Sequence, residues 1–167
     1  KGIQLNEVGR YGTVTVNNNT LIETDGISLH GYGSTSYDNI FEITNNTILE
    51  TNGYGMVVYN ASGLIISGNT VKNSISWAVY VNDGSGYYDS PYEIFDNIIT
   101  DNQYGLELSR ASANIENNTI SDNNYDGLYL HTNFTNPREV TIQYNSIINN
   151  GNDGIDVREY LSPVVQY

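Results

Sequence analysis

Residues 40–58 read IFEITNNTILETNGYGMVV and contain every part of the repeat that decides the fold. Isoleucines lie three residues before and two residues after Asn46, at Ile43 and Ile48. Apolar side chains at alternate positions predict short strands with one buried face. A Gly-Met-Val-Val unit follows at 55–58 and predicts another such strand. Asn and Gly between these strands are turn formers.

The same pattern recurs along the chain and can be aligned on one asparagine of each copy. The aligned asparagines, separated by 27, 23, 28, 21 and 27 residues, are Asn19, Asn46, Asn69, Asn97, Asn118 and Asn145. Three residues before them stand Val16, Ile43, Ile66, Ile94, Ile115 and Ile142. Two residues after them stand Leu21, Ile48, Val71, Ile99, Ile120 and Ile147. A unit of Gly or Ala followed by two alternating aliphatic residues comes next each time, at 26–29, 55–58, 78–81, 105–108, 127–130 and 154–157.

Three strands in each period are typical of an all-β, right-handed parallel β-helix of about six coils. Each coil would stack on its neighbours about 4.8 Å away, because no coil can bury its own apolar side chains. The aligned asparagines are then expected to form a ladder of side-chain amides. Residues 1–167 form one β-helix domain in this interpretation, either a segment of a longer array or the subunit of a filament.

Composition limits the classes of partner. A net charge of −13 opposes binding to nucleic acid, because few basic side chains are present to neutralise phosphates. The chain has no cysteine, which excludes disulfides and thiolate metal sites. No apolar run approaches 18 residues, so no membrane-spanning helix is expected. Because the sequence starts at Lys1, we expect a mature or excised fragment.

The pattern I-x-x-N-x-I, an Asn-rich turn and G-I/L-x-L resembles the parallel β-helix repeats of the pectin-lyase-like superfamily, over residues 2–157. It is most similar to the Asn-rich repeats of archaeal and bacterial cell-surface proteins, including adhesin-like and NosD-like proteins and the carbohydrate-binding and sugar-hydrolase group. The resemblance implies an extracellular or cell-surface location. It does not imply one activity, because this architecture hosts lyases, hydrolases, epimerases, adhesins and inert stalks.

In relatives, the substrate usually lies along the outer face of the sheet that carries the G-I/L-x-L unit. The outward positions there are Ser28, Val57, Tyr80, Glu107, Tyr129 and Asp156, and, two residues further on, His30, Tyr59, Asn82, Ser109, His131 and Arg158. Tyr59, Tyr80 and Tyr129, with Glu107 between the last two, are candidates for a carbohydrate-binding surface, since aromatic rings suit sugar rings. The alternative is that tyrosine simply suits exposed strands.

Glu107 and Asp156 are the candidate catalytic residues. They would lie two coils apart, roughly 10 Å, near the upper limit for an inverting glycosidase pair. Solvated surface charge is the alternative, because 19 acidic residues on a regular lattice produce such pairs by chance. The chain lacks the G-H-G and R-I-K segments of the lyases and polygalacturonases that it resembles in fold, which disfavours lyase chemistry.

Asp126 and Asp153, on adjacent coils, are candidate Ca²⁺ ligands, because a hard cation would relieve the repulsion between stacked carboxylates. Solvated acids in a polar turn are the alternative, and no other cofactor is expected. His30 and His131 would lie four coils apart, too far to share a metal ion.

Long segments rich in Tyr, Ser, Asn and Gly, a composition suited to recognition, lie at 30–40, 82–91 and 131–139. Candidate glycosylation sites are Asn18, Asn45, Asn60, Asn117 and Asn133.

Two functions are compatible with these patterns. The first is a noncatalytic extracellular structural or adhesive module that associates with itself, head to tail or laterally, or with cell-surface glycans. The second is a polysaccharide-binding or polysaccharide-degrading domain, with Tyr80, Glu107, Tyr129 and Asp156 as its site.

Overall fold

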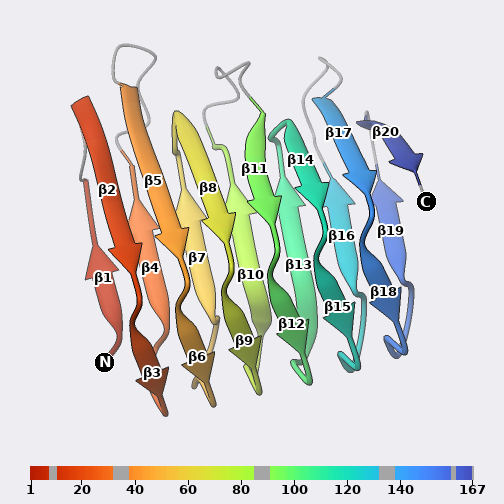
Figure 1. Ribbon diagram of the computed structural model, residues 1–167, viewed down its shortest axis with the longest axis horizontal. Coiled ribbons are helices and arrows are strands. Elements are labelled where there is room, and N and C mark those ends of the chain that lie inside the picture. Colours follow the sequence, from red (N-terminus) through yellow and green to blue (C-terminus); the bar gives the residue numbers. More distant parts are fainter. Residues whose placement is uncertain (8–10, 32–37, 85–90, 132–137, 159–160, 167) are drawn as a thin grey trace.

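The computed structural model describes residues 1–7, 11–31, 38–84, 91–131, 138–158 and 161–166. The described chain consists of β-strands joined by turns and contains no helix (Figure 1). Every pair of neighbouring strands is parallel, and each coil contributes one strand to each of three sheets. The predicted parallel β-helix of about six coils, with three short strands in each coil, is therefore confirmed.

The three sheets run along the solenoid and are named here A, B and C. Sheet A consists of β1 (Ile3–Leu5), β4 (Ile27–His30), β7 (Met56–Tyr59), β10 (Trp77–Asn82), β13 (Tyr104–Ser109), β16 (Leu128–His131) and β19 (Ile155–Arg158). Sheet B consists of β2 (Tyr11–Asn17), β5 (Asp38–Thr44), β8 (Gly63–Ser67), β11 (Tyr92–Phe95), β14 (Ala113–Glu116), β17 (Arg138–Gln143) and β20 (Leu161–Gln166). Sheet C consists of β3 (Thr20–Ile22), β6 (Thr47–Leu49), β9 (Thr70–Lys72), β12 (Ile98–Thr100), β15 (Thr119–Ser121) and β18 (Ser146–Ile148).

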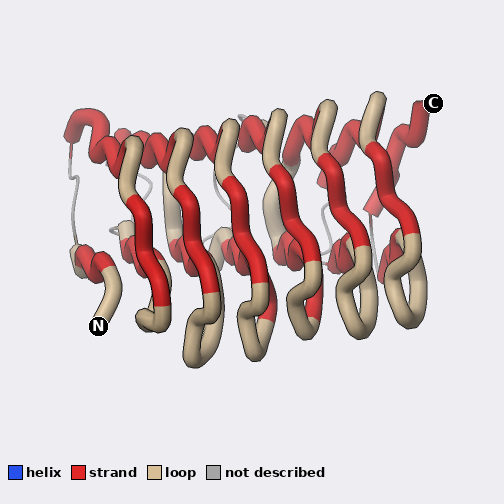
Figure 2. The backbone as a smooth tube through the Cα atoms, turned by 60° about the horizontal axis from the view of Figure 1, so that its bottom comes forward, coloured by secondary structure: helices blue, strands red, loops and turns tan. Residues whose placement is uncertain are grey.

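Columns of aliphatic side chains fill the interior of the solenoid. The register pairs equivalent residues of successive coils, for example Ile43 with Ile66 in sheet B and Ile48 with Val71 in sheet C. These four side chains are fully buried, as the alternating pattern predicts. Figure 2 shows the coils lying side by side, so each coil covers the apolar edge of the one before it. Burial of each such side chain contributes about 1.5–3 kcal/mol.

The predicted asparagine ladder is present and continuous. Each side-chain amide donates a hydrogen bond to the Oδ1 atom of the next ladder residue, for example from Asn69 to Asn97 and from Asn97 to Asn118, over 2.9–3.0 Å. The same Oδ1 atom also accepts a backbone N–H, as Asn97 does from Asn69. Because the middle members are buried, these bonds satisfy polar groups that would otherwise be costly to bury.

The structure corrects one detail of the ladder. Asparagine tolerates a left-handed backbone and the ladder asparagine was the residue expected in the bend, but the left-handed backbone lies one residue earlier. Positive φ angles between 53° and 63° occur there at Asn18, Asn45, Gly68, Asp96, Asn117 and Tyr144. A second left-handed bend, with φ between 53° and 59°, follows five residues later at Glu23, Glu50, Asn73, Asp101, Asp122 and Asn149. These two bends set the ends of sheet C.

A second, shorter ladder lies five residues after the first, and the sequence analysis missed it. Asn102 donates to Asn123 Oδ1 over 3.1 Å, and Asn123 donates to Asn150 Oδ1 over 2.9 Å. The backbone N–H of Ser74 donates to Asn102 Oδ1, so serine stands at the ladder position of the coil before. Both turns that flank sheet C are therefore held by amide ladders in the later coils.

The glycine that begins the G-I/L-x-L unit is explained by steric crowding between adjacent coils. A Cβ atom on Gly105 would lie 2.0 Å from the carbonyl oxygen of Gly127 in the next coil. Adjacent coils therefore approach too closely for most side chains at this position. The close approach brings the strands of sheet A into tight register and aligns the residues on its outer face.

Candidate functional site

Two rows of side chains point outward from sheet A, and the strand register confirms both rows. The first row contains Gln4, Ser28, Val57, Tyr80, Glu107, Tyr129 and Asp156. The second row contains His30, Tyr59, Asn82, Ser109, His131 and Arg158. The candidate carbohydrate-binding residues therefore share one face, as predicted. The same register places His30 and His131 four strands apart, in agreement with the expected separation.

Tyr54, Tyr59 and Tyr80 form a group that we call the tyrosine cluster. The ring centroids of Tyr59 and Tyr80, and those of Tyr54 and Tyr80, are 5.6 Å apart. Their planes are inclined by 55° and 62°, so the rings do not cover one another face to face. His30 packs edge-on against Tyr59 at 4.6 Å. Tilted rings leave parts of their faces available to a ligand.

The environment of the tyrosine cluster changes the acidity of Tyr59. Burial raises the pKa of the Tyr59 hydroxyl above its ordinary value of 10.0, and the neighbouring Tyr80 and Tyr54 add to this effect. A hydrogen bond with Tyr80 and the charge of Glu107 also raise this pKa. Asn82 donates from its amide to the Tyr80 hydroxyl oxygen over 3.0 Å. The Tyr59 hydroxyl therefore holds its proton more tightly than an ordinary tyrosine, and the Tyr80 hydroxyl is held by Asn82.

Trp77, Tyr104 and Tyr125 form a second group that we call the stacked column. Trp77 and Tyr104 lie 4.6 Å apart with planes 27° from parallel, and Tyr104 and Tyr125 lie 4.7 Å apart at 16°. Because stacked rings cover one another's faces, this column stabilises the coil edge and offers a ligand mainly ring edges. The repeat pattern alone did not predict this column. A signal was present, since Tyr54, Trp77 and Tyr104 stand immediately before the G-I/L-x-L unit of successive coils.

Glu107 lies beneath this aromatic layer. Trp77 in β10 and Tyr129 in β16 flank β13, so their strands are roughly 10 Å apart. Their ring centroids are only 5.8 Å apart, so both side chains lean over β13, which carries Glu107. The Glu107 residue is accordingly only 8% exposed. Its Oε1 atom contacts His131 Nε2 at 2.9 Å, which gives the buried carboxylate one polar partner.

The carboxyl groups of the two predicted catalytic residues, Glu107 and Asp156, both already have polar partners. Glu107 and Asp156 lie two strands apart, as expected, but Tyr129 stands between them in the register. Asp156 forms a salt bridge with Arg158, with an N–O distance of 2.8 Å. Arg158 also lies over the Tyr129 ring, 5.4 Å from its centroid. An inverting glycosidase needs room for a nucleophilic water between its two carboxyl groups, and here the Tyr129 side chain stands at that position.

Asp126 and Asp153 lie on adjacent coils, as the sequence indicated. The Oδ1 atom of Asp126 accepts hydrogen bonds from the Asn152 amide, over 2.6 Å, and from the backbone N–H of Asp153, over 3.1 Å. Within the described ranges, no group of three or more His, Cys, Asp or Glu side chains is placed to hold a metal ion. A Ca²⁺ site at this pair remains a prediction.

The candidate glycosylation sites also remain predictions. Asn18, Asn45 and Asn117 are exposed, and each immediately precedes a ladder asparagine. Asn60 is half-buried and also has a positive φ of 53°. Asn133 lies outside the described residues, as do most of the long segments at 30–40, 82–91 and 131–139.

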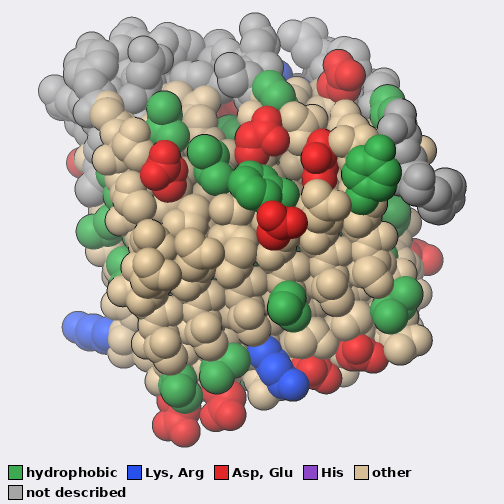
Figure 3. All heavy atoms as spheres, in the orientation of Figure 1, with side chains coloured by type: hydrophobic (Ala, Val, Ile, Leu, Met, Phe, Trp, Pro, Cys, Tyr) green, Lys and Arg blue, Asp and Glu red, His purple; other side chains and the backbone are tan. Residues whose placement is uncertain are grey.

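The described outward residues of sheets B and C do not form an aromatic surface like that of sheet A. Figure 3 shows the face that they form, with hydrophobic side chains in small separate groups among acidic and uncharged polar ones. Exposed apolar residues of sheets B and C, among those described, include Ile22, Ile40, Ile98, Ile148 and Val164. Single exposed apolar side chains of this kind are normal, so the described part of this face offers no arrangement like that on sheet A.

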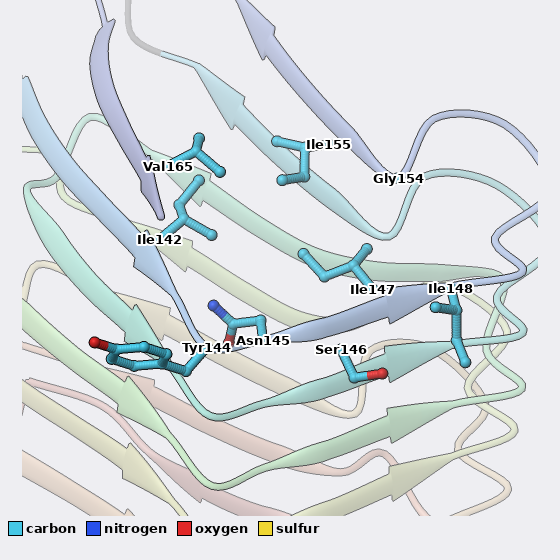
Figure 4. A pocket seen from close by; sticks show the side chains of 9 residues that line it. All are labelled: Ile142, Tyr144, Asn145, Ser146, Ile147, Ile148, Gly154, Ile155 and Val165. Atoms are coloured by element: carbon cyan, nitrogen blue, oxygen red, sulfur yellow. The ribbon is translucent and has the colours of Figure 1, made fainter. Parts of the chain in front are cut away.

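A second candidate site is an apolar pocket of about 520 Å³ at the last described coil (Figure 4). It is lined by Ile142, Tyr144, Asn145, Ser146, Ile147, Ile148, Gly154, Ile155 and Val165. Asn145 is the last member of the ladder. Its backbone N–H, unlike that of Asn118, has no hydrogen-bond partner among the described residues. At the opposite end, a pocket of about 390 Å³ contains Asn19, whose Oδ1 atom accepts no hydrogen bond from the described residues.

The described part of the chain holds no helix long and apolar enough to cross a membrane. No curated protein matches the chain, and no solved structure matches it either. The family described as right-handed beta helix region matches residues 1–166. That match covers nearly the whole sequence and agrees with the three parallel sheets and the amide ladder. The chain is therefore a member of the right-handed beta-helix family.

Proposed function

We propose that this protein is a noncatalytic, extracellular adhesive β-helix module that binds a polysaccharide chain along the outer face of sheet A. The observation that carries the proposal is the tyrosine cluster, in which rings from adjacent coils are tilted and partly exposed beside fixed polar groups. Tilted rings offer apolar faces to sugar rings, and the polar groups offer partners to sugar hydroxyls. The regular coils of the solenoid suit an extended ligand, because equivalent outward positions recur about every 4.8 Å along sheet A.

Three features favour binding over catalysis. Glu107 is held by His131, Asp156 is held by Arg158, and Tyr129 stands between the two carboxylates. General acid–base hydrolysis needs two carboxyl groups with access to the same glycosidic bond and water. A surface without such a pair holds a glycan and leaves it intact. The resemblance to cell-surface repeat proteins supports the extracellular location.

Affinity electrophoresis in gels that contain a panel of soluble polysaccharides tests the proposal. We expect at least one polysaccharide to retard the protein and to remain uncleaved after prolonged incubation. Tyr59→Ala and Tyr80→Ala should each weaken the retardation by about fivefold or more, because stacking on one aromatic ring contributes about 1 kcal/mol. Tyr144→Ala is the matched control, since Tyr144 is 62% exposed and lies between β17 and β18.

Retardation by none of the polysaccharides would contradict the proposal, and so would equal effects of Tyr80→Ala and Tyr144→Ala. Release of reducing ends that depends on Glu107 would instead establish the glycoside hydrolase alternative.

A second candidate function is head-to-tail self-association, and the two coil ends favour it. The backbone N–H of Asn145 and the Oδ1 atom of Asn19, neither of which has a hydrogen-bond partner among the described residues, complement each other, so a second copy of this chain would continue the ladder. The same docking would cover the apolar pocket shown in Figure 4. Sedimentation velocity should then show a mass that rises with concentration, and Val165→Asp should abolish the rise. Ile98→Asp, on the outer face of sheet C, is the control, and a monomer at all concentrations would reject self-association.

A further inference from the structure

We infer that the sheet A surface selects polysaccharides by charge, and that it accepts uncharged chains and rejects polyuronates. This inference rests on the proposed function, because it specifies the class of ligand for the same surface.

The first support is the distribution of charge on the strands that carry the aromatic side chains. The four strands β7, β10, β13 and β16 contain one carboxylate, Glu107, and neither Lys nor Arg. The nearest described cation in the outward rows is Arg158 on β19, and it is already paired with Asp156 at 2.8 Å. Recognition of a uronate carboxylate normally uses a positively charged side chain, and these strands do not supply one.

The second support is the position of Glu107 within the surface. Its register neighbours are Tyr80 and Tyr129, so a chain lying across both tyrosines passes over it. Glu107 also lies beside the tyrosine cluster, because its register neighbour Tyr80 belongs to that cluster, and its charge contributes to the raised pKa of Tyr59. No Lys or Arg on the four strands lies beside Glu107 to compensate its charge. A second carboxylate within several ångströms would be repelled, because the surrounding aromatic rings exclude water and weaken screening.

The third support is that the same groups suit uncharged sugars. The side chain of Asn82 and the Tyr80 hydroxyl form a polar pair at 3.0 Å. Sugar hydroxyls can donate to these oxygens while ring C–H groups contact the tyrosine faces. An uncharged chain therefore gains both kinds of contact without electrostatic repulsion. The net charge of −13 adds a long-range repulsion that affects polyanions only.

The test compares polysaccharides that share a backbone and differ in charge. The pairs are hydroxyethyl cellulose with carboxymethyl cellulose, and methyl-esterified with de-esterified polygalacturonan. Binding is measured by biolayer interferometry at about pH 8 in about 10 mM and about 500 mM salt. We expect the uncharged member of a pair to bind at least about tenfold more tightly at low salt, and the ratio to approach one at high salt.

Glu107→Gln removes the charge and keeps a group that can contact His131. It should reduce the low-salt ratio by at least about threefold, whereas Glu93→Gln, on the outer face of sheet B, should leave it unchanged. Thermal unfolding of both variants establishes that they fold, and the salt dependence of the unsubstituted protein tests the inference without any variant.

Equal affinity for the charged and uncharged members at low salt would overturn the inference, and so would a ratio insensitive to both salt and Glu107→Gln. Either result would leave the proposed function intact, because polysaccharide is still bound. Failure of every polysaccharide, charged or uncharged, to bind would instead overturn the proposed function and this inference with it.

Discussion

His131 Nε2 lies 2.9 Å from Glu107 Oε1, and this contact joins strands β13 and β16 inside the aromatic part of sheet A. The two residues are 24 positions apart in the chain, one coil, and the register brings them to adjacent strands. The contact fixes the direction of a carboxylate that the leaning side chains of Trp77 and Tyr129 largely bury. Glu107 is thus a constrained polar group on this face, which is why the proposed charge selectivity depends on it.

Tyr59 should titrate later than an ordinary tyrosine. Its burial and its tyrosine neighbours raise its pKa above 10.0, so the folded protein keeps this proton after the unfolded chain has lost its own. The contribution of Tyr59 to stability is therefore constant below about pH 10 and falls as the pH rises from there through the raised pKa. Alkaline difference absorbance should show a late component that Tyr59→Phe removes. Loss of an ordinary component near pH 10 instead would contradict the assignment.

The amide ladder should stabilise the middle of the solenoid more than its end. Asn97 is buried and bonds to Asn69, Asn118, Ile66 and Phe95, so Asn97→Ala leaves several buried groups without partners. We expect it to lower the free energy of unfolding by about 3 kcal/mol. Asn145→Ala should cost about half as much, because Asn145 is half-buried and water can replace its bonds. Urea unfolding followed by circular dichroism measures both values, and equal losses would contradict the account.

Extending the second ladder should stabilise the protein. Ser74 Oγ is buried and has no hydrogen-bond partner among the described residues, and Ser74 occupies the position that precedes Asn102 in this ladder. In Ser74→Asn, the new amide should donate to Asn102 Oδ1 as Asn102 does to Asn123. We expect a gain of about 1 kcal/mol in the free energy of unfolding, with Ser76→Asn as the control. A loss of stability would show that the packing around Ser74, whose Oγ lies close to Gly55, leaves too little space for the amide.

Trp77 should act on stability more than on polysaccharide binding. Its ring stacks on Tyr104 and contacts Tyr129, so Trp77→Ala should lower the free energy of unfolding by about 3 kcal/mol, and Trp77→Phe by less. Affinity per folded molecule should fall less in Trp77→Phe than in Tyr80→Ala, because stacking already covers the Trp77 faces. A larger loss of affinity in Trp77→Phe would move the binding site to the stacked column.

The fold was predictable because its determinants lie at fixed positions in each repeat. Ile43 and Ile66 are both recognisably aliphatic, and the ladder asparagines are identical residues, so the register could be read without coordinates. The second ladder was harder to recognise, because Thr24, Thr51 and Ser74 occupy its position in the earlier coils. Its later members, Asn102 and Asn123, nevertheless stand five residues after ladder asparagines.

The site was predictable only in part. The outward rows follow from the period-two alternation, so the shared face of Tyr59, Tyr80 and Tyr129 could be inferred. The contact between Trp77 and Tyr129 depends on side chains that lean across an intervening strand, and register does not determine side-chain rotamers. Tyr125 joins the stacked column from the residue before Asp126, one position out of the repeat, so alignment on the Gly did not reveal it.

The central claim is that sheet A is the surface that holds a polysaccharide. The most direct measurement is a ¹⁵N–¹H correlation titration of the labelled protein with an oligosaccharide prepared from the tightest-binding polysaccharide of the panel. The account predicts that the shifted amide signals belong to β7, β10, β13 and β16, around Tyr59, Tyr80 and Glu107. Shifts confined to sheets B and C or to the coil ends, with sheet A unchanged, would contradict it.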